Sequence, residues 1–313
     1  MIRVVAPSRL HFGLFHVPSG DHPPAEQRIF GGVGLMIDQP GVVVAARVAA
    51  SSQFEGVLAS RAQHFATRFL VSLPECRRRA FQVLVERCPR EHIGLGVGTQ
   101  LALAVAKALA VAGEEGDGPA VTLAERVGRG ERSAVGVHGF DAGGLIIEAG
   151  KQPGETISPL LAHVNLPTAW RVVLFIPPVA GRWYGVSEQR AFAAATDGQA
   201  EILRTIAEQG ILPAARRGDL PAFGEAVYEF NRKAGEPFAV AQGGVYASRD
   251  VAELIAAIRR CGIHAVGQSS WGPTVFAVVE DSASAQGLIA RWGQRIPAFV
   301  ARIATGHRVE KPS

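Results

Sequence analysis

The chain has 313 residues, of which 48% are hydrophobic and 19% are charged. This composition is typical of a folded protein with a sizeable core and excludes an intrinsically disordered one, and the length indicates one large domain or two. The 32 basic and 28 acidic residues give a formal net charge of only +4, which disfavours a nucleic-acid-binding protein with a clustered basic face.

Three dispersed cysteines, Cys76, Cys88 and Cys261, include no C-x-x-C pair. We therefore expect neither a disulfide framework nor a structural zinc site, and a reducing, cytoplasmic location. The N-terminus has no signal-peptide pattern. The longest apolar stretch, 101–112, is interrupted by Lys107 and is shorter than the roughly 20 residues that span a bilayer. We expect no membrane association.

The first half of the chain is predicted to mix strands and helices. Alternating or β-branched residues between glycine and proline breaks predict strands at 2–6, 10–16, 33–38 and 42–49. A helix over 58–71, a strand at 80–88 and an apolar helix over 101–112 follow. The capping-box pattern T-L-A-E at 122–125 predicts another helix start, and a strand at 145–148 closes this half.

The second half is predicted to have a different order. We expect strands at 171–176, 264–268, 274–280 and 299–304, with helices over 188–208, 220–234, 249–260 and 283–292. Ser248 and Gly262 are the expected caps of the helix over 249–260. If the consecutive helices over 188–260 are counted as one element, the second half has the order β-α-β-β-α-β of a ferredoxin-like fold. The proline- and glycine-containing link at 150–167 predicts domains at 1–160 and 161–313.

The strongest single motif is a glycine-rich loop between a strand and an apolar helix. Gly94, Gly96 and Gly98 would let the backbone approach a ligand closely, Thr99 adds a hydroxyl, and the helix N-terminus adds amide donors. The sequence therefore predicts a phosphate site here, although a glycine turn without a ligand is the simpler alternative. The spacing fits neither the Walker pattern nor the Rossmann fingerprint.

This loop, P-x-x-x-x-G-L-G-x-G-T-Q, resembles the ATP loop of the GHMP kinase superfamily. The resemblance implies an α+β fold, with an N-terminal domain like ribosomal S5 domain 2 and a C-terminal ferredoxin-like domain. Further segments resemble one branch, the β-ribofuranosylaminobenzene (or hydroxybenzene) 5′-phosphate synthases, and run through the whole chain: S-R-L-H at 8–11, R-G-E-R-S-A-V-G at 129–136, F-D-A-G-G at 140–144, G-V-S-E at 185–188, Q-G-G-V-Y at 242–246 and Q-S-S-W-G-P-T-V at 268–275.

Three departures separate the chain from a kinase or from the branch's usual pattern. The kinase segment P-S-G-x-D, which supplies a catalytic aspartate, is absent between Arg132 and Gly144, and S-S-W-G-P at 269–273 replaces the C-terminal kinase glycine loop. Val97 stands where the branch more usually has serine, which would remove one hydroxyl from the phosphate loop.

The resemblance implies a decarboxylating pentosyl transfer. The branch joins 5-phosphoribosyl 1-diphosphate to 4-hydroxybenzoate or 4-aminobenzoate and releases CO₂ and diphosphate, an early step toward tetrahydromethanopterin. Diphosphate leaves through an oxocarbenium-like state, so Mg²⁺ and hydrogen-bond donors are expected. The expected partners are these two small-molecule substrates. A homodimer is left open, and we expect neither nucleic-acid nor membrane binding.

The candidate site residues follow from this chemistry and from the motifs. Arg9 and Arg132 are expected to clamp carboxylate or phosphate. His11 shares strand parity with Arg9, so both would face the same side. Asp141 and Glu188 are expected to be catalytic groups or Mg²⁺ ligands. The predicted phosphate contacts are Gly94, Gly96, Gly98, Thr99, Ser269 and Ser270.

Two other functions remain as alternatives at this point. The first is an ATP-dependent small-molecule kinase of the same superfamily, which would form ADP with an alcohol substrate. The second is an RNA-binding protein that uses the S5-like half, which the weak and interspersed charge disfavours.

Overall fold

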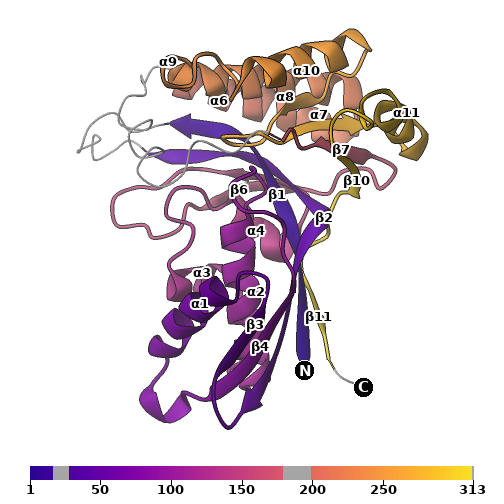
Figure 1. The fold of residues 1–313 in the computed structure, drawn as a ribbon. Coiled ribbons are helices and arrows are strands. Elements are labelled where there is room, and N and C mark those ends of the chain that lie inside the picture. The colour runs from indigo at the N-terminus through magenta and orange to yellow at the C-terminus, as the bar shows by residue number, and fades with distance from the viewer. Residues whose placement is uncertain (17–27, 179–198, 312–313) are drawn as a thin grey trace.

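The computed structural model describes residues 1–16, 28–178 and 199–311 (Figure 1). Two long strands, β1 (Ile2–His16) and β2 (Phe30–Ala49), pair antiparallel along most of the molecule. The sequence predicts two shorter strands in place of each. The structure keeps β1 continuous through two register shifts, between Ala6 and Ser8 and between His11 and Gly13, because a β-bulge absorbs an irregular residue without ending the strand.

β1 and β2 form the centre of a seven-stranded sheet with the order β11-β1-β2-β4-β3, and β5 and β6 extend from the other part of β2. The additional strands are β3 (Gln53–Gly56), β4 (Ala80–Arg87), β5 (Leu145–Glu148), β6 (Leu160–Val164) and β11 (Arg308–Glu310). The sequence analysis missed β3, β6 and β11, which are short strands at the sheet margins. β3 and β11 each have a single large apolar residue, and β6 lies in the stretch 150–167 that was read as a link.

Helices of the first half cover one face of this sheet: α1 (Ala59–Val71), the short η1 (Glu75–Arg77), α2 (Val97–Ala112), α3 (Ala120–Val127) and α4 (Val135–Ala142). α2 is buried along nearly its whole length, as its apolar sequence predicts. The capping-box prediction is wrong, because α3 begins at Ala120 and Thr122 lies inside it. The carboxylate of Asp141 instead accepts from the Ala120 amide at 2.7 Å.

The second sheet has the order β10-β7-β9-β8, with all neighbours antiparallel. Its strands are β7 (Arg171–Phe175), β8 (Val266–Gln268), β9 (Val275–Val279) and β10 (Ala298–Arg302). Numbered along the chain, this is the order 4-1-3-2, and the predicted β-α-β-β-α-β arrangement is confirmed. Ser248 caps the helix after it, as expected, by accepting from the Val251 amide.

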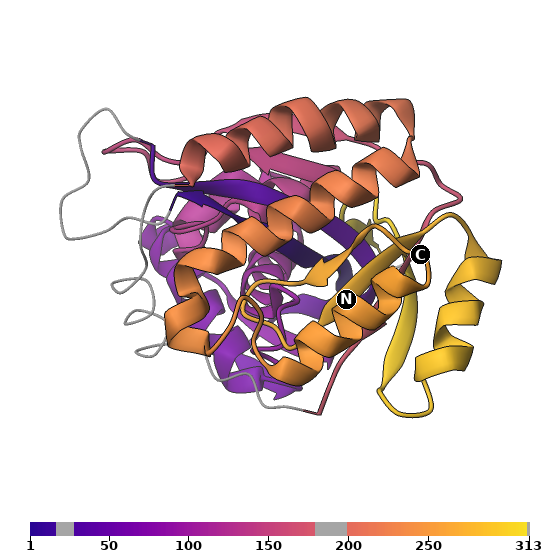
Figure 2. The same cartoon turned by 90° about the horizontal axis from the view of Figure 1, so that it is seen from above.

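The helices of the second half lie side by side over the upper end of β1 and β2 (Figure 2). They are α6 (Ala200–Thr205), the π-helical η2 (Ile206–Ile211), α7 (Leu212–Arg217), α8 (Leu220–Gly235), η3 (Glu236–Phe238), α9 (Ala239–Gln242) and α10 (Arg249–Arg260), with α11 (Ser282–Trp292) beside β7 and β10. The part of the predicted helix 188–208 that precedes residue 199 lies outside the described residues.

The two halves share a core. Phe12 of β1 stacks on Phe276 of β9 with ring centroids 4.9 Å apart, and one buried cluster includes residues of both sheets and of α8. β6 crosses the predicted boundary at 160, and β11 returns to pair with β1. Burial across this junction fixes the second half of β1, which carries the candidate residues Arg9 and His11.

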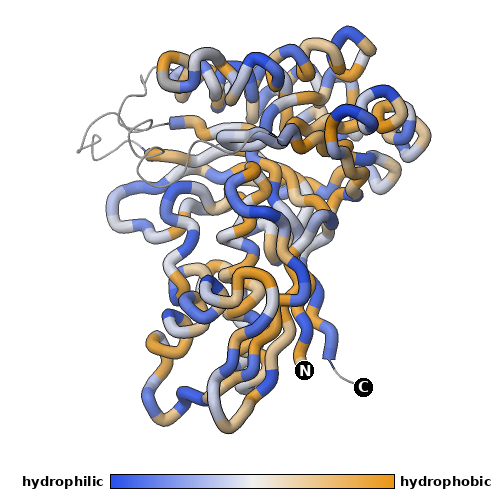
Figure 3. Tube along the Cα trace, in the orientation of Figure 1, coloured by the Kyte–Doolittle hydropathy of each residue, from blue (hydrophilic) through white to orange (hydrophobic). Residues whose placement is uncertain are grey.

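Hydrophobic residues concentrate along the strands in the middle of the molecule, and hydrophilic ones in the loops at its edge (Figure 3). Among the residues that the structure describes, no helix is long and apolar enough to cross a membrane.

Candidate active site

A cavity of about 430 Å³ lies where β1, the glycine loop, the turn before α4 and the β8–β9 hairpin meet. A volume of this size suits a small-molecule site. Most predicted site residues line it: Arg9, His11, Gly94, Gly96, Gly98, Thr99, Arg132 and Ser270.

The three loop positions are occupied by glycine for different structural reasons. Gly94 has φ +89°, and a Cβ there would lie 2.3 Å from the carbonyl oxygen of Ser269, so this glycine permits backbone packing. Gly96, with φ +67°, begins α2, and its Cβ would lie 3.0 Å from Nε of Arg9. A Cβ on Gly98 would lie 3.1 Å from Nη2 of Arg129. Gly96 and Gly98 therefore let guanidinium groups approach the N-terminus of α2, where backbone amides favour anions.

Two arginines that the sequence analysis did not select complete this end of the cavity. Arg129 donates from Nη2 to Oγ1 of Thr99 over 3.2 Å, and Arg61 forms an ion pair with Glu91. Both guanidinium groups lie over the ring of Phe65. Burial, and then the charge of Arg61, lowers the pKa of Arg129. The R-G-E-R segment at 129–132 was the available signal for Arg129.

Arg9 and His11 face the same cavity, which confirms the parity argument. The Arg9 amide donates to the Leu95 carbonyl over 3.0 Å, which joins β1 to the glycine loop. The side chain of His11 is buried, and this burial, with the charge of Arg9 adding to it, holds its pKa well below the usual value of 6.5. His11 is therefore held as a neutral imidazole, in which one ring nitrogen carries the proton and the other can accept a hydrogen bond.

His11 is the first member of a chain of polar groups that leads inward. Its Nε2 lies 3.1 Å from Oγ of Ser133, and that hydroxyl lies 2.6 Å from Oε1 of Glu148. Glu148 is fully buried at the end of β5, and burial raises its pKa. The sequence analysis read Glu148 only as a strand end. A carboxylate that closes the run L-I-I-E was the signal for a buried acid.

The two hairpin serines have separate positions. Ser269 is fully buried; its hydroxyl donates to the Gly94 carbonyl over 2.6 Å and accepts from the His11 amide at 3.0 Å. Ser270 is exposed at the cavity, and its amide donates to the His11 carbonyl over 2.9 Å. Ser269 thus holds the loop and β1 together, and of the two serines Ser270 is the one at the cavity.

Asp141 and Glu188, predicted as catalytic groups or metal ligands, are not brought to this cavity by the structure. Asp141 lies near the end of α4, where its carboxylate binds the α3 amide and faces Nδ1 of His307 at 3.4 Å. Glu188 lies outside the described residues. Within 1–16, 28–178 and 199–311, no group of three His, Cys, Asp or Glu side chains could hold a metal ion. Glu91 and Glu131 are carboxylates that do line the cavity.

Another part of the cavity lining contains aromatic residues. Phe238 packs edge-on against Trp271, with ring centroids 4.6 Å apart, and Leu14 also packs against Phe238. Asn231 of α8 stiffens this part of the lining: its Nδ2 donates to the carbonyls of Phe12 and Gln268 over 2.6 and 2.8 Å.

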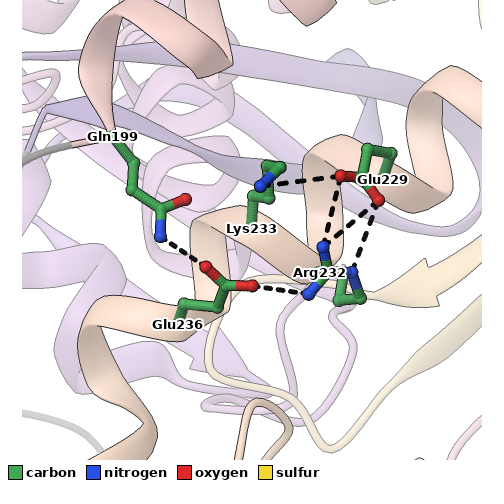
Figure 4. A network of polar contacts seen from close by, with 5 residues as sticks. All are labelled: Gln199, Glu229, Arg232, Lys233 and Glu236. Carbon is green, nitrogen blue, oxygen red and sulfur yellow. Dashed lines mark hydrogen bonds and ion pairs between the residues drawn. The ribbon is translucent and has the colours of Figure 1, made fainter.

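A polar network on another side of α8 ties its C-terminal turn to the beginning of α6 (Figure 4). It consists of Gln199, Glu229, Arg232, Lys233 and Glu236. Because the pairs are partly exposed, each contributes little to stability by itself. Together they fix the helix that carries Asn231 to the cavity.

Comparison with known proteins gives the family. Residues 211–298 match the model of the GHMP kinases C terminal domain. The chain is 30% identical to the beta-ribofuranosylphenol 5′-phosphate synthase of Archaeoglobus fulgidus, covering 90% of this chain and 89% of the relative. It is also 30% identical to the protein of the same name from Methanothermobacter thermautotrophicus, covering 88% of each.

Solved structures confirm the fold class. The homoserine kinase of Cytophaga hutchinsonii superposes with a TM-score of 0.71 at 14% identity, covering 99% of this chain and 97% of that one. The mevalonate diphosphate decarboxylase of Trypanosoma brucei gives 0.71 at 13% identity, covering 99% and 98%. These identities show a GHMP-kinase-like fold alone, whereas the closer sequence relatives are synthases. The chain belongs to the beta-ribofuranosylphenol 5′-phosphate synthase family.

Proposed function

We propose that this enzyme transfers the ribosyl 5-phosphate group of 5-phosphoribosyl 1-diphosphate to a para-substituted benzoate, with release of CO₂ and diphosphate, toward tetrahydromethanopterin. The observation that carries the proposal is that one cavity combines cationic and aromatic lining residues. Arginines surround the glycine loop, the aromatic rings of Phe238 and Trp271 belong to the same lining, and neutral His11 also lines the cavity. This arrangement is complementary to one highly charged and one aromatic substrate.

The diphosphate binds at the N-terminus of α2 in this proposal. The α2 amides, the hydroxyl of Thr99 and the guanidinium groups of Arg61 and Arg129 all lie at that end. Arginine forks match phosphate oxygens in two contacts at once, and donors already in place stabilise the charge of a departing diphosphate without reorganisation.

The benzoate ring lies against Phe238 and Trp271, with its carboxylate toward Arg9 or Arg132. Holding the ring carbon opposite the anomeric carbon replaces a random encounter by a fixed geometry. The names of the relatives refer to a phenol product, which favours 4-hydroxybenzoate as the acceptor. The neutral imidazole of His11 accepts the hydroxyl proton, which increases electron density in the ring.

We propose Mg²⁺ as the partner of the diphosphate in this cavity. Magnesium is commonly held by one or two carboxylates together with substrate phosphates. Glu91 is already paired with Arg61, so we propose the exposed Glu131 as the carboxylate of the cavity for the ion. When bound, Mg²⁺ offsets the charge of the leaving diphosphate. A homodimer and a cytoplasmic location stay predictions from the sequence.

The test is product formation from defined substrates. The purified enzyme is incubated with 5-phosphoribosyl 1-diphosphate, Mg²⁺ and either 4-hydroxybenzoate or 4-aminobenzoate, and a C-riboside 5′-phosphate is sought by mass spectrometry. Parallel incubations contain ATP with homoserine, mevalonate or galactose. We expect the C-riboside and no ADP. ADP formation without C-riboside would replace the proposal by the kinase alternative.

A further inference from the structure

Glu148 is buried beneath the cavity and does not line it. It contacts the cavity through two intermediaries, since Oε1 lies 2.6 Å from the Ser133 hydroxyl and that hydroxyl lies 3.1 Å from His11 Nε2. The other carboxylate oxygen accepts from the Ala134 amide at 2.7 Å. Burying a carboxylate costs free energy unless hydrogen-bond donors surround it. The position of Glu148 at the inner end of the His11–Ser133–Glu148 series therefore suggests a function.

The hydrogen bonds between Glu148, Ser133 and His11 have a defined direction. An ionised carboxylate only accepts hydrogen bonds, and a serine hydroxyl has a single proton to donate. If Ser133 donates that proton to Glu148, its oxygen can only accept from His11. Nε2 of His11 then carries the ring proton, and Nδ1 is the unprotonated nitrogen.

Hydrogen-bond donors meet both carboxylate oxygens of Glu148, the Ser133 hydroxyl at Oε1 and the Ala134 amide at Oε2, which is the arrangement that an ionised carboxylate accepts. Burial raises its pKa, whereas hydrogen bonds from Ser133, Ala134 and Ser158 act in the opposite direction. The amide of Val135, at the start of α4, acts in the same direction as these donors. Lys151 is a nearby cation: burial lowers its pKa, and the charges of Glu131 and Glu148 act in the opposite direction.

We propose that Glu148 is a positioning residue that holds His11 in the Nε2-protonated tautomer through Ser133. The inference rests on the proposed function in one respect: Nδ1 is then the nitrogen that accepts the hydroxyl proton of the acceptor benzoate. No bond is made or broken at Glu148 itself. Its carboxylate fixes which of the two imidazole nitrogens can serve as the base.

Glu148→Gln reverses the direction of these hydrogen bonds, while the shape of the side chain is nearly unchanged. The Ala134 amide needs an acceptor, so the carboxamide oxygen of the variant occupies the Oε2 position and its NH₂ group faces Ser133. Ser133 then accepts from that NH₂ group and donates to His11 Nε2. The proton of the imidazole moves to Nδ1, which is the wrong nitrogen for catalysis in this proposal.

The direct experiment is ¹⁵N NMR of the histidine rings in the full chain without substrate at about pH 8. His11 signals are assigned by their loss in His11→Gln. We expect an Nε2-protonated pattern in the wild type and an Nδ1-protonated pattern in Glu148→Gln. An Nδ1-protonated His11 in the wild type, or an unchanged pattern in the variant, would overturn the proposal. Because substrate is absent, this result is independent of the proposed function.

A second variant tests the link when Glu148→Gln does not fold. Ser133→Ala removes the intermediary and leaves the Ala134 contact in place, so we expect a mixture of tautomers. Ser133→Thr keeps the hydroxyl and is expected to restore the Nε2-protonated form. Unchanged spectra in Ser133→Ala would contradict the inference as well.

Kinetics separates positioning from substrate binding. We expect Glu148→Gln to lower kcat by roughly 100-fold, the size of a general-base contribution, with little change of KM for either substrate. Glu55→Gln, the same substitution on an exposed side chain of β3, is the matched control and should behave as the wild type. A loss confined to KM would exclude a role through the base.

Discussion

The hydroxyl of Ser269 donates to the carbonyl of Gly94 over 2.6 Å and joins the β8–β9 hairpin to the glycine loop. The same oxygen accepts from the His11 amide at 3.0 Å. One buried side chain thus connects three segments that are far apart in the sequence, and all three segments line the cavity.

Ser269→Ala is therefore expected to disturb both the fold and the site. Leaving a buried carbonyl and amide without this partner costs about 1–3 kcal/mol of unfolding free energy. Loosening of the glycine loop should also weaken 5-phosphoribosyl 1-diphosphate binding. Denaturant unfolding and calorimetry measure the two effects. Ser51→Ala, at an exposed position before β3, serves as the control, and equal behaviour of the two variants would contradict the role of Ser269.

Gly98→Ala tests the anion site more cleanly than Gly96→Val. Gly96 has φ +67° and its Cβ would press on Arg9, so valine there also strains the backbone. Gly98 lacks a positive φ, and its Cβ would meet only the guanidinium ends of Arg129 and Arg61, at 3.1 and 3.3 Å.

We expect Gly98→Ala to keep the stability of the wild type and to weaken 5-phosphoribosyl 1-diphosphate binding by about tenfold, which corresponds to roughly 1.4 kcal/mol. Gly96→Val should lose binding and also stability. Calorimetric titration and thermal unfolding measure both. Wild-type affinity in Gly98→Ala would place the diphosphate elsewhere in the cavity.

Arg9 is expected to act through the geometry of its guanidinium group. Arg9→Lys keeps the charge and loses the two-point contact, and Arg9→Met keeps much of the apolar stem. Both variants should fold and lose most of the activity. Arg47→Met, at an exposed position of β2, is the control for removal of an arginine. Near-normal turnover in Arg9→Met would move the clamp to another residue.

The low pKa of His11 has a consequence for stability. In the unfolded chain this histidine regains a pKa of about 6.5. Below that pH the unfolded state binds a proton that the folded state does not, so the free energy of unfolding falls as the pH falls. The groups that face His11 are the cation of Arg9, the hydroxyl of Ser133 and, behind it, Glu148.

We expect the wild type to lose stability relative to His11→Gln as the pH decreases from about 7.5 to about 5.5. Urea unfolding at several pH values measures this difference, and His64→Gln, on the exposed side of α1, is the control. A difference that does not vary with pH would show that His11 titrates normally in the folded chain.

Local sequence patterns predict the parts of the site that depend on neighbouring residues. Strand parity places Arg9 and His11 on one side, and the glycine loop followed by an apolar run predicts the start of α2. The cavity confirms the parity prediction. The helix is confirmed, but it begins at Val97 rather than at the predicted residue 101, so Gly98 and Thr99 lie in its first turn.

The remaining site residues depend on long-range pairing. Glu148 reaches Ser133 only because β5 pairs with β2 at Gly32 beside β1. Asp141 follows Arg132 closely in the sequence, but α4 rises about 1.5 Å per residue and carries the aspartate roughly 10 Å away along its axis. Arg61 is contributed by α1, before the glycine loop. No periodicity in the sequence indicates these contacts between distant segments.

The most direct test of the central claim is the stoichiometry of the two released products. The enzyme is given 5-phosphoribosyl 1-diphosphate, Mg²⁺ and 4-hydroxybenzoate labelled at the carboxyl carbon, and labelled CO₂ and diphosphate are measured in the same reaction. The account predicts equal amounts of both, and neither product without Mg²⁺. Diphosphate release without CO₂ would contradict it and indicate an ordinary phosphoribosyltransferase or a hydrolase on this fold.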